Sequence, residues 1–365
     1  MEKIVDVIES IANEKSLDIE LVRECVKNAF INTAKKLFGE EYQYEAVYEA
    51  NGKNIKLYQK ILVVEDEDER ALDSEHFITL SKAKQIDKVI DLGDELTYEI
   101  NLENLGRTAS QTLAKEFEYH IQKLQQDKIF ADLQNRVGTL INGTVIRVDS
   151  EETTFVELDD CRAYMPRKSR IKGEHFKMGD HIRAVIKKVL ISKSRGVTVE
   201  LSRTSPKFLE AMLKAEVPEI TDGAVQIIAS ARIPGERAKV AILSNSSSID
   251  PVGATVGTKG VRITAVSKEL KDENIDVIEY TKQPEIFISR AMSPAIVNFV
   301  KIEDKKATVF ISPEQKSKAI GKSGINIRLA SMLTGFEITI EEAEEEKRNE
   351  NKPNALESLK ALFGE

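Results

Sequence analysis

The chain has 365 residues, with 53 Lys or Arg against 61 Asp or Glu, and a formal net charge of −8 at pH 7. This length allows about two to four domains. No apolar run approaches the roughly 20 residues that cross a bilayer, and the N-terminus is too acidic for a signal peptide. These features predict a cytoplasmic protein without a membrane association. Cys25 and Cys161 stand alone and the four histidines lack metal-ligand spacing, so we expect no disulfide framework, no metal and no cofactor.

The charge is unevenly distributed along the chain. Residues 1–130 contain 17 Lys or Arg and 27 Asp or Glu, residues 131–340 contain 32 and 26, and residues 341–365 contain 4 and 8. Local potential, and not net charge, decides whether a surface attracts RNA phosphates. The basic middle is therefore compatible with RNA binding, whereas the acidic ends favour protein partners or solubility.

Residues 1–130 are predicted to form an α/β head. Helix-period apolar residues indicate helices over residues 4–12 and 18–37, the second beginning at Asp18 and stopped by Gly39. Strand patterns follow at residues 42–47, 55–57 and 60–64 and again after Gly93. A long polar helix over residues 108–135 is expected to be a rigid connector to the next domain.

Residues 135–203 are predicted to form a five-stranded OB-type barrel, because five short alternating strands follow one another there. The strands are expected at residues 138–149, 153–158, 162–166, 180–191 and 196–202. Between Arg162 and Arg195 the chain has eleven Lys or Arg against two acidic residues. Phe155 and Tyr164 are candidate base-stacking rings, with Arg162 and Arg167 as neighbouring cations. A core position is equally compatible with Phe155, whereas a surface position is favoured for Tyr164.

Two Gly-x-x-Gly motifs lie 64 residues apart in matching surroundings, and they indicate an internal duplication. They read Gly257-Thr258-Lys259-Gly260 and Gly321-Lys322-Ser323-Gly324. Glycines without a Cβ allow close approach of a sugar-phosphate chain, and the N-terminus of a following helix offers free N–H groups to phosphate. With the strand-strand-helix-GxxG-helix-strand pattern around each motif, this arrangement is typical of KH domains, which clamp about four nucleotides of single-stranded RNA. In the second copy a short helix is expected near residues 292–298, before its strand pair.

Several side chains in and after these motifs are candidate RNA ligands. Lys259 and Lys322 are predicted phosphate cations, with Thr258 and Ser323 beside them in the loops. The predicted contacts to phosphate or base edges at the start of the following helices are Arg262, Asn326 and Arg328, with a solvated surface role as the alternative for each. The cations that flank the first KH hairpin, for which a structural role is equally compatible, are Arg232, Arg237 and Lys239.

The order of these domains and four short stretches carry a resemblance to a known family. The stretches are residues 10–15 (SIANEK), 216–220 (EVPEI), 249–254 (IDPVGA) and 327–331 (IRLAS). Over residues 1 to about 343 the chain resembles the NusA family of bacterial transcription elongation, termination and antitermination factors. The resemblance implies a multidomain α+β protein without enzymatic activity. Its expected parts are an α/β head (1–130), an S1-type OB-fold barrel (135–203), two tandem type II KH domains (204–281 and 282–343) and an acidic, disordered tail (344–365).

The resemblance also implies partners and activities. The head is expected to bind RNA polymerase at the β flap region near the RNA exit channel, while the barrel and KH pair bind nascent single-stranded RNA. Modulation of hairpin-dependent pausing, intrinsic termination and antitermination would follow, with other Nus factors and Rho as further partners of a monomeric protein. Many family members continue into acidic helical repeats that restrain RNA binding, and this sequence ends at Glu365 without them. We therefore expect RNA binding without that restraint.

Three alternatives to this interpretation differ in class. Gly321-Lys322-Ser323 imitates the end of a nucleotide-binding P-loop, but that motif needs glycine at position 316, where Lys316 stands. A phosphorolytic exoribonuclease combines KH and S1-type modules in the opposite order, after catalytic domains. A polymerase-independent RNA chaperone or ribosome-associated RNA-binding protein keeps the RNA chemistry, and a pull-down with core RNA polymerase separates it from the transcription factor.

Overall fold

The computed structural model describes residues 4–49, 54–73, 76–100, 106–158, 161–192 and 196–342. The chain divides into two compact units, Met1–Asp132 and Leu133–Glu365. The tail predicted to be disordered, residues 344–365, lies outside the described residues. Among the helices within these ranges, none combines the length and apolar character that crossing a membrane requires.

The first unit begins with two helices whose ends the sequence predicts well. Helix α1 spans Ile4–Glu14 and helix α2 spans Ile19–Phe38. The Asp18 carboxylate accepts hydrogen bonds from the backbone N–H groups of Glu20 and Leu21 at 2.9 and 3.2 Å. Such an N-cap satisfies donors that the first turn leaves unpaired. Gly39, at φ 130°, ends the helix as predicted.

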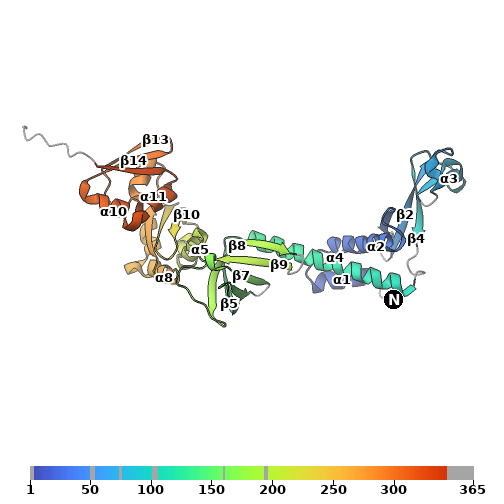
Figure 1. Ribbon diagram of the computed structural model, residues 1–365, viewed down its shortest axis with the longest axis horizontal. Coiled ribbons are helices and arrows are strands. Elements are labelled where there is room, and N and C mark those ends of the chain that lie inside the picture. Colours follow the sequence, from blue (N-terminus) through green and yellow to red (C-terminus); the bar gives the residue numbers. More distant parts are fainter. Residues whose placement is uncertain are drawn as a thin grey trace, which may run out of the picture. The chain divides into compact units, whose positions relative to one another are not determined.

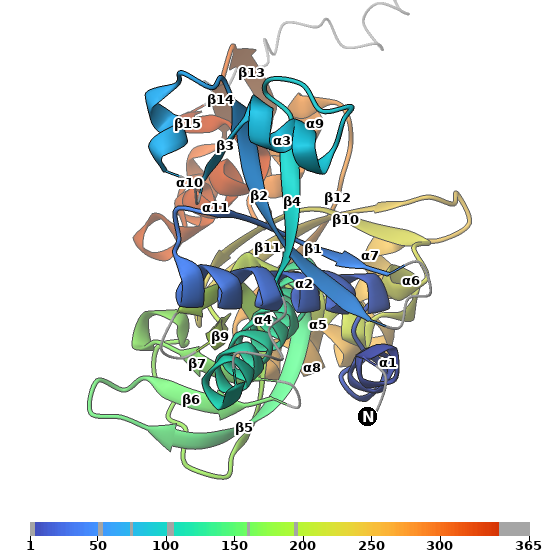
Figure 2. The ribbon, with the colours of Figure 1, turned by 90° about the vertical axis from the view of Figure 1, so that its right-hand side faces the viewer.

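A four-stranded sheet follows, built around one long strand. Strand β2 (Ile55–Val64) pairs antiparallel with β1 (Gln43–Tyr48) and β4 (Glu95–Ile100), and parallel with β3 (Phe77–Thr79). Figure 2 shows β2 and β4 side by side. The prediction of two strands, at 55–57 and 60–64, is wrong. Tyr58 and Gln59 stay in the strand because β1 and β4 both pair with them.

Two further elements of this unit were not predicted from the sequence, and one predicted helix has an additional role. The unpredicted elements are β3 and the short helix α3 (Leu80–Ile86). Helix α4 (Gly106–Asn135) is the expected long polar helix (Figure 1). Its Ile121 is buried in a core with Ile8, Val22 and Val26 of α1 and α2. Part of α4 therefore belongs to the head, and its role as a connector stays a prediction.

The second unit begins with a closed five-stranded barrel, as predicted. Its strands run in the order β5-β6-β7-β9-β8, and pairing of β5 with β8 closes it. The strands are β5 (Leu140–Val148), β6 (Thr154–Glu157), β7 (Arg162–Met165), β8 (His181–Ser192) and β9 (Gly196–Ser202), with a 3-10 turn, η3 (Arg167–Ser169), after β7.

Two KH domains follow, each with a three-stranded sheet whose first two strands are antiparallel and whose last strand is parallel to the second. The first contains α5 (Pro206–Glu216), α6 (Pro218–Thr221), β10 (Val225–Ile233), β11 (Arg237–Ser244), α7 (Pro251–Val256), η4 (Thr258–Gly260), α8 (Val261–Glu269) and β12 (Asn274–Glu279). The second contains α9 (Pro284–Ala291), β13 (Phe299–Glu303), β14 (Lys306–Ile311), η5 (Pro313–Gln315), α10 (Lys316–Ile320), η6 (Lys322–Gly324), α11 (Ile325–Thr334) and β15 (Glu337–Glu342).

One helix in the second KH domain lies earlier than predicted. The sequence suggested a helix over residues 292–298, but α9 occupies Pro284–Ala291. Pro284 stands in the first turn, where its missing N–H leaves no intrahelical bond unmade. The predicted fold class is otherwise confirmed as an N-terminal domain, a closed barrel and two tandem KH domains.

The sheet of the first KH domain is packed on both faces. One face lies on its own helices, in a core that includes Phe208, Leu213, Val240 and Val266. The opposite face contributes apolar residues to the core of the second KH domain, where Ala231, Ala241 and Ile278 pack with Ile288 and Leu329. Because one apolar core crosses the junction, relative motion of the two KH domains would expose buried apolar surface.

Candidate nucleic-acid interface

The two GxxG loops have the same backbone conformation, which confirms the duplication inferred from the sequence. We call residues 257–260 the first loop and residues 321–324 the second loop. The matched dihedral angles (φ, ψ) are 76°, 169° at Gly257 and 73°, 175° at Gly321; 54°, 25° at Lys259 and 54°, 27° at Ser323; and 74°, 16° at Gly260 and 74°, 14° at Gly324. φ is positive at each of these matched positions, and this backbone region favours glycine. Glycine occupies the first and last of the three positions in both loops.

The two glycines of each loop have different surroundings. A Cβ at Gly257 would lie 2.8 Å from Cγ of Arg262, and a Cβ at Gly321 would lie 2.8 Å from Cβ of Asn326. The first glycine therefore lets the loop pack on the helix that follows. A Cβ at Gly260 would meet no atom closer than 3.8 Å, and one at Gly324 would meet none within 4 Å. The open side of each loop lies at the second glycine.

Arg262 and Asn326 lie beneath their loops, so the prediction that they face phosphate or bases is corrected. The Arg262 guanidinium Nη1 donates to the Ala254 carbonyl at 2.7 Å and to the Glu219 carboxylate at 2.8 Å. Asn326 is 2% exposed, and its Nδ2 donates to the carbonyl oxygens of Met292 and Ala319 at 3.0 and 3.1 Å. These bonds hold the helix before each loop against the helix after it.

The polar side chains on the loops themselves are exposed. They are Thr258 and Lys259 in the first loop and Lys322 and Ser323 in the second. By conformation Lys259 matches Ser323 and Thr258 matches Lys322, so the lysine occupies different positions in the two loops. No side chain caps the N-terminus of α8 or α11. A helix N-terminus without a side-chain cap and a nearby ammonium group together suit a phosphate.

The predicted stacking rings lie on the outer face of the barrel. Phe155 on β6 and Tyr164 on β7 are directly opposite in register and are half-buried, while their chain neighbours Val156 and Ala163 face the interior. The possibility that Phe155 is a core residue is therefore excluded. The Arg147 guanidinium carbon lies 4.3 Å from the centroid of the Phe155 ring, a cation–π contact.

The row continues from Tyr164 across the next two strands. Its hydroxyl donates to the Glu200 carboxylate at 3.3 Å, and the ammonium groups of Lys187 and Lys188 lie 2.9 and 3.1 Å from the same carboxylate. Burial alone would raise the pKa of Glu200, but the hydrogen bonds from the two lysines lower it. The ionised carboxylate thus positions two lysines and a tyrosine on one surface.

Sequence reasoning missed three cations of this row, Arg147, Lys187 and Lys188. Their strands were predicted, and outward alternation marks Arg147, but the cross-strand register that brings β5 and β8 to the same row was not readable from the sequence. Arg162 and Arg167 are exposed, as expected for RNA contacts. Arg167 also forms an ion pair with Glu152, with Nε and Oε2 3.0 Å apart.

All three cations around the first KH hairpin form ion pairs within the fold, and Arg237 donates two hydrogen bonds to the Asp276 carboxylate, both at 2.8 Å. The side chains of Arg232 and Glu273 are 0% exposed, and Nε of Arg232 donates to the carboxylate oxygens at 2.8 and 2.9 Å. The buried Lys239 ammonium donates to Asp276 at 2.9 Å and to the carbonyl of Ser293, in the second KH domain, at 2.6 Å. Burial lowers the pKa of Lys239.

Comparison with known proteins agrees with this architecture. Three family models match the chain: the NusA N-terminal domain over residues 3–127, the NusA-like first KH domain over residues 203–280, and the NusA-like second KH domain over residues 284–348. A relative from Helicobacter pylori, "Transcription termination/antitermination protein NusA", is 42% identical over 100% of both chains. The chain belongs to the NusA family.

Other NusA relatives bear the same name and also cover nearly the whole chain. The protein from Thermus thermophilus is 37% identical over 99% of this chain and 98% of its own length. The protein from Bacillus subtilis is 30% identical over 97% of this chain and 95% of its own.

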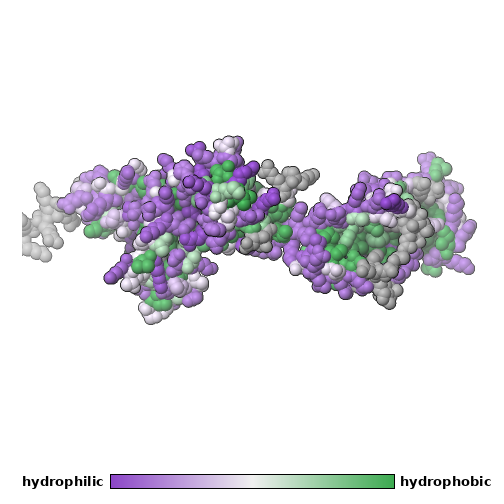
Figure 3. Space-filling model, turned by 90° about the horizontal axis from the view of Figure 1, so that it is seen from below, coloured by the Kyte–Doolittle hydropathy of each residue, from purple (hydrophilic) through white to green (hydrophobic). Residues whose placement is uncertain are grey.

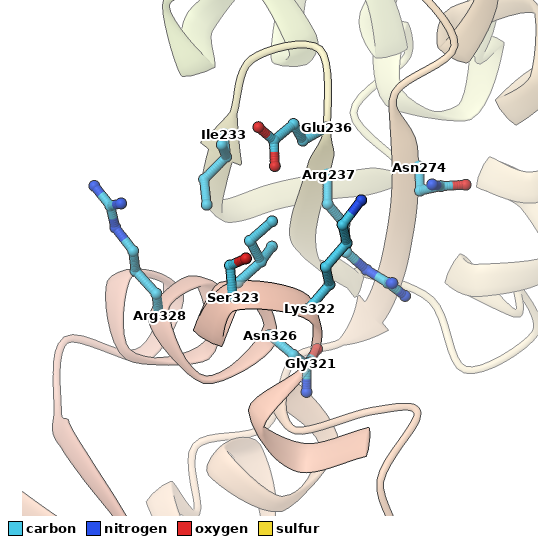
Figure 4. Close-up of a pocket in the computed structure, with 10 residues that line it drawn as sticks. Ile233, Glu236, Arg237, Asn274, Gly321, Lys322, Ser323, Asn326 and Arg328 are labelled. Atoms are coloured by element: carbon cyan, nitrogen blue, oxygen red, sulfur yellow. The ribbon is translucent and has the colours of Figure 1, made fainter. Parts of the chain in front are cut away.

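In this NusA chain the second loop faces the hairpin of the first KH domain. A cleft of about 700 Å³ separates them, and Figure 4 shows Lys322 and Ser323 across from the β10–β11 turn. Arg328 lines the same cleft from α11. Lys322, Ser323 and Arg328 thus line one cleft. Hydrophilic residues cover most of the visible surface of the barrel and KH domains (Figure 3).

Proposed function

We propose that this protein regulates transcription elongation and termination by holding nascent single-stranded RNA while it is bound to RNA polymerase. The observation that carries the RNA part is the pair of loops with one backbone conformation, each with an unobstructed second glycine and an exposed lysine. The family and the names of the relatives support the transcription part. No bond is made or broken in this function, so we propose a binding factor and not an enzyme.

Tethering makes weak RNA contacts effective in this proposal. The head binds polymerase at the β flap region near the RNA exit channel, and the barrel and KH pair then meet RNA at an effective concentration in the millimolar range for a short linkage. RNA held there favours formation or persistence of a hairpin, and with it pausing, intrinsic termination or antitermination. The proposal includes a monomer in the cytoplasm with other Nus factors and Rho as further partners.

The proposed RNA site comprises the loop residues and the outer face of the barrel. Its members are Gly257, Thr258, Lys259, Gly260, Gly321, Lys322, Ser323, Gly324, Arg328, Phe155, Tyr164, Arg162 and Arg167. Arg262 and Asn326 support the loops from below, as their hydrogen bonds to Ala254 and Ala319 indicate. One continuous strand crossing both KH domains is consistent with their shared core.

A double substitution in the first loop tests the RNA part. Thr258→Asp with Lys259→Asp places two carboxylates where phosphate would bind and should lower RNA affinity at fixed salt by at least about tenfold, with unchanged circular dichroism. Thr281→Asp with Lys282→Asp changes the same dipeptide outside both loops and serves as the control. Equal affinities for the two variants would exclude the first loop as a phosphate site.

An in vitro transcription assay on a hairpin-pause template tests the polymerase part. We expect the wild-type protein to lengthen the pause and the loop variant to do so less. If RNA binding is normal but the protein neither changes the pause nor is retained by core RNA polymerase, the polymerase-independent RNA chaperone becomes the better interpretation.

A further inference from the structure

The cleft between the two KH domains contains a carboxylate where an RNA site would be expected to contain only cations and neutral groups. Its walls come from the β10–β11 hairpin and the start of β12 on one side and from the second loop and α11 on the other. In Figure 4 the Glu236 carboxylate lies between the hairpin turn and the second loop, across from Ser323 and Lys322. Ile233 and Ile325 provide apolar walls.

The charged groups near this cleft fall into two sets. Arg232, Arg237, Lys239, Glu273 and Asp276 are paired with one another or with backbone carbonyls, and Arg237 is the one of these that lines the cleft. Within the described part of the two KH domains, Glu236, Asn274, Lys322 and Arg328 form no side-chain hydrogen bond or ion pair. Polar groups that line a cleft between tightly packed domains without protein partners are available to a ligand.

We propose that this cleft is a base-selective subsite for RNA, in which Glu236 favours a base with an exocyclic amino group over uracil. The inference rests on the proposed RNA-binding function of the KH pair. Lys322 and Arg328 attract the phosphates that flank the selected nucleotide, and Ile233 and Ile325 contact its base. The Glu236 carboxylate then accepts a hydrogen bond from the base edge.

The selectivity follows from the hydrogen-bonding groups involved. An ionised carboxylate only accepts hydrogen bonds, and it pairs well with amino groups such as N4 of cytosine. Uracil presents a single N–H between two carbonyl oxygens, so a carboxylate that approaches its edge meets repelling acceptors. A carboxylate beside an RNA strand also repels phosphate. Glu236 therefore lowers affinity for a wrong base more than it raises affinity for a right one.

A uridine scan of a short RNA tests this inference. The full chain is titrated at fixed salt with fluorescent decamers of adenosine in which one uridine replaces each position in turn. We expect one position at which uridine weakens binding by about tenfold, the range of one good base contact. Glu236→Gln supplies an amide donor as well as an acceptor and should reduce that penalty below about threefold. Glu285→Gln makes the same change at an exposed position of α9 and should leave the penalty unchanged.

The outcomes separate this inference from the proposed function. If wild type binds no decamer, RNA binding by the KH pair is wrong and the inference fails with it. If every decamer binds equally, or if the uridine penalty survives in Glu236→Gln, the base-selective subsite is wrong while RNA binding stands. Glu236 is an exposed turn residue, so circular dichroism of Glu236→Gln is expected to match wild type.

Discussion

Substitution of the two glycines of the second loop by alanine should affect different properties, because the two glycines have different neighbours. We expect the first substitution to lower stability and the second to weaken RNA binding. At Gly321, alanine would occupy a backbone region reserved for glycine, which costs about 1–3 kcal/mol. Its Cβ would also lie 2.8 Å from Cβ and 3.0 Å from the backbone nitrogen of Asn326, and such overpacking costs about 1–3 kcal/mol. We expect Gly321→Ala to lower the free energy of unfolding by about 4 kcal/mol.

At Gly324, alanine meets no atom within 4 Å. Its left-handed conformation costs about 1–2 kcal/mol. The added methyl group instead occupies the open side of the loop, where we propose that phosphate binds. Gly324→Ala should therefore weaken RNA binding by at least about tenfold, the loss of one charge-assisted hydrogen bond, while it lowers the free energy of unfolding by only about 1–2 kcal/mol.

Thermal unfolding and RNA titration separate these effects. One kcal/mol shifts Tm by about 2–4 °C in a domain of 150–250 residues, so we expect a decrease of about 12 °C for Gly321→Ala and about 4 °C for Gly324→Ala. Gly335, at φ 78° and ψ 9° with no atom near its Cβ, is a stereochemical match for Gly324 outside the loop. If Gly321→Ala destabilises no more than Gly335→Ala, the clash argument is wrong. If Gly324→Ala and Gly335→Ala bind RNA equally, the open side of the loop is not a phosphate site.

Two further predictions concern the barrel and the KH junction. Phe155→Ala should weaken RNA binding by about 1–3 kcal/mol, the range for one stacked base. The control is Phe299→Ala, which removes an exposed ring on β13 and should leave RNA binding unchanged. Equal effects of the two substitutions in anisotropy titrations would contradict a stacking role for Phe155. Burial alone would raise the pKa of Asp276, but hydrogen bonds from Arg237 and Lys239 lower this pKa in the folded state. The ionised Asp276 therefore stabilises the fold above about pH 4, and this contribution is lost as pH falls through the lower folded-state pKa. The difference in urea stability between wild type and Asp276→Asn should therefore shrink from pH 6 to pH 3, and a constant difference would refute the linkage.

Local sequence signals predicted most elements, and the errors have identifiable causes. Asp18 and Gly39 marked the ends of α2 because capping depends on a few adjacent residues. The break predicted inside β2 was wrong because two neighbouring strands keep Tyr58 and Gln59 extended, and those neighbours are distant in sequence. Strand β3 was too short to show a pattern at all.

At the candidate site, too, local sequence signals predicted some features correctly and tertiary packing decided others. The GxxG spacing identified the loops, but it could not show that Arg262 and Asn326, five positions after the first glycine of each motif, pack beneath the loops. Arg262 and Asn326 looked like surface ligands because their side chains are polar. Asn326 is buried and Arg262 is half-buried because the helices on either side of each loop pack together.

The sequence by itself determined the order of the domains, the two loops and the family, because each depends on local pattern and short motifs. Only the tertiary structure decided that the KH domains share one core, that Arg147, Lys187 and Lys188 join Phe155 and Tyr164 in one row, and that the second loop faces the hairpin of the first KH domain. These features depend on pairing register and on packing between distant segments, which no local window of residues contains.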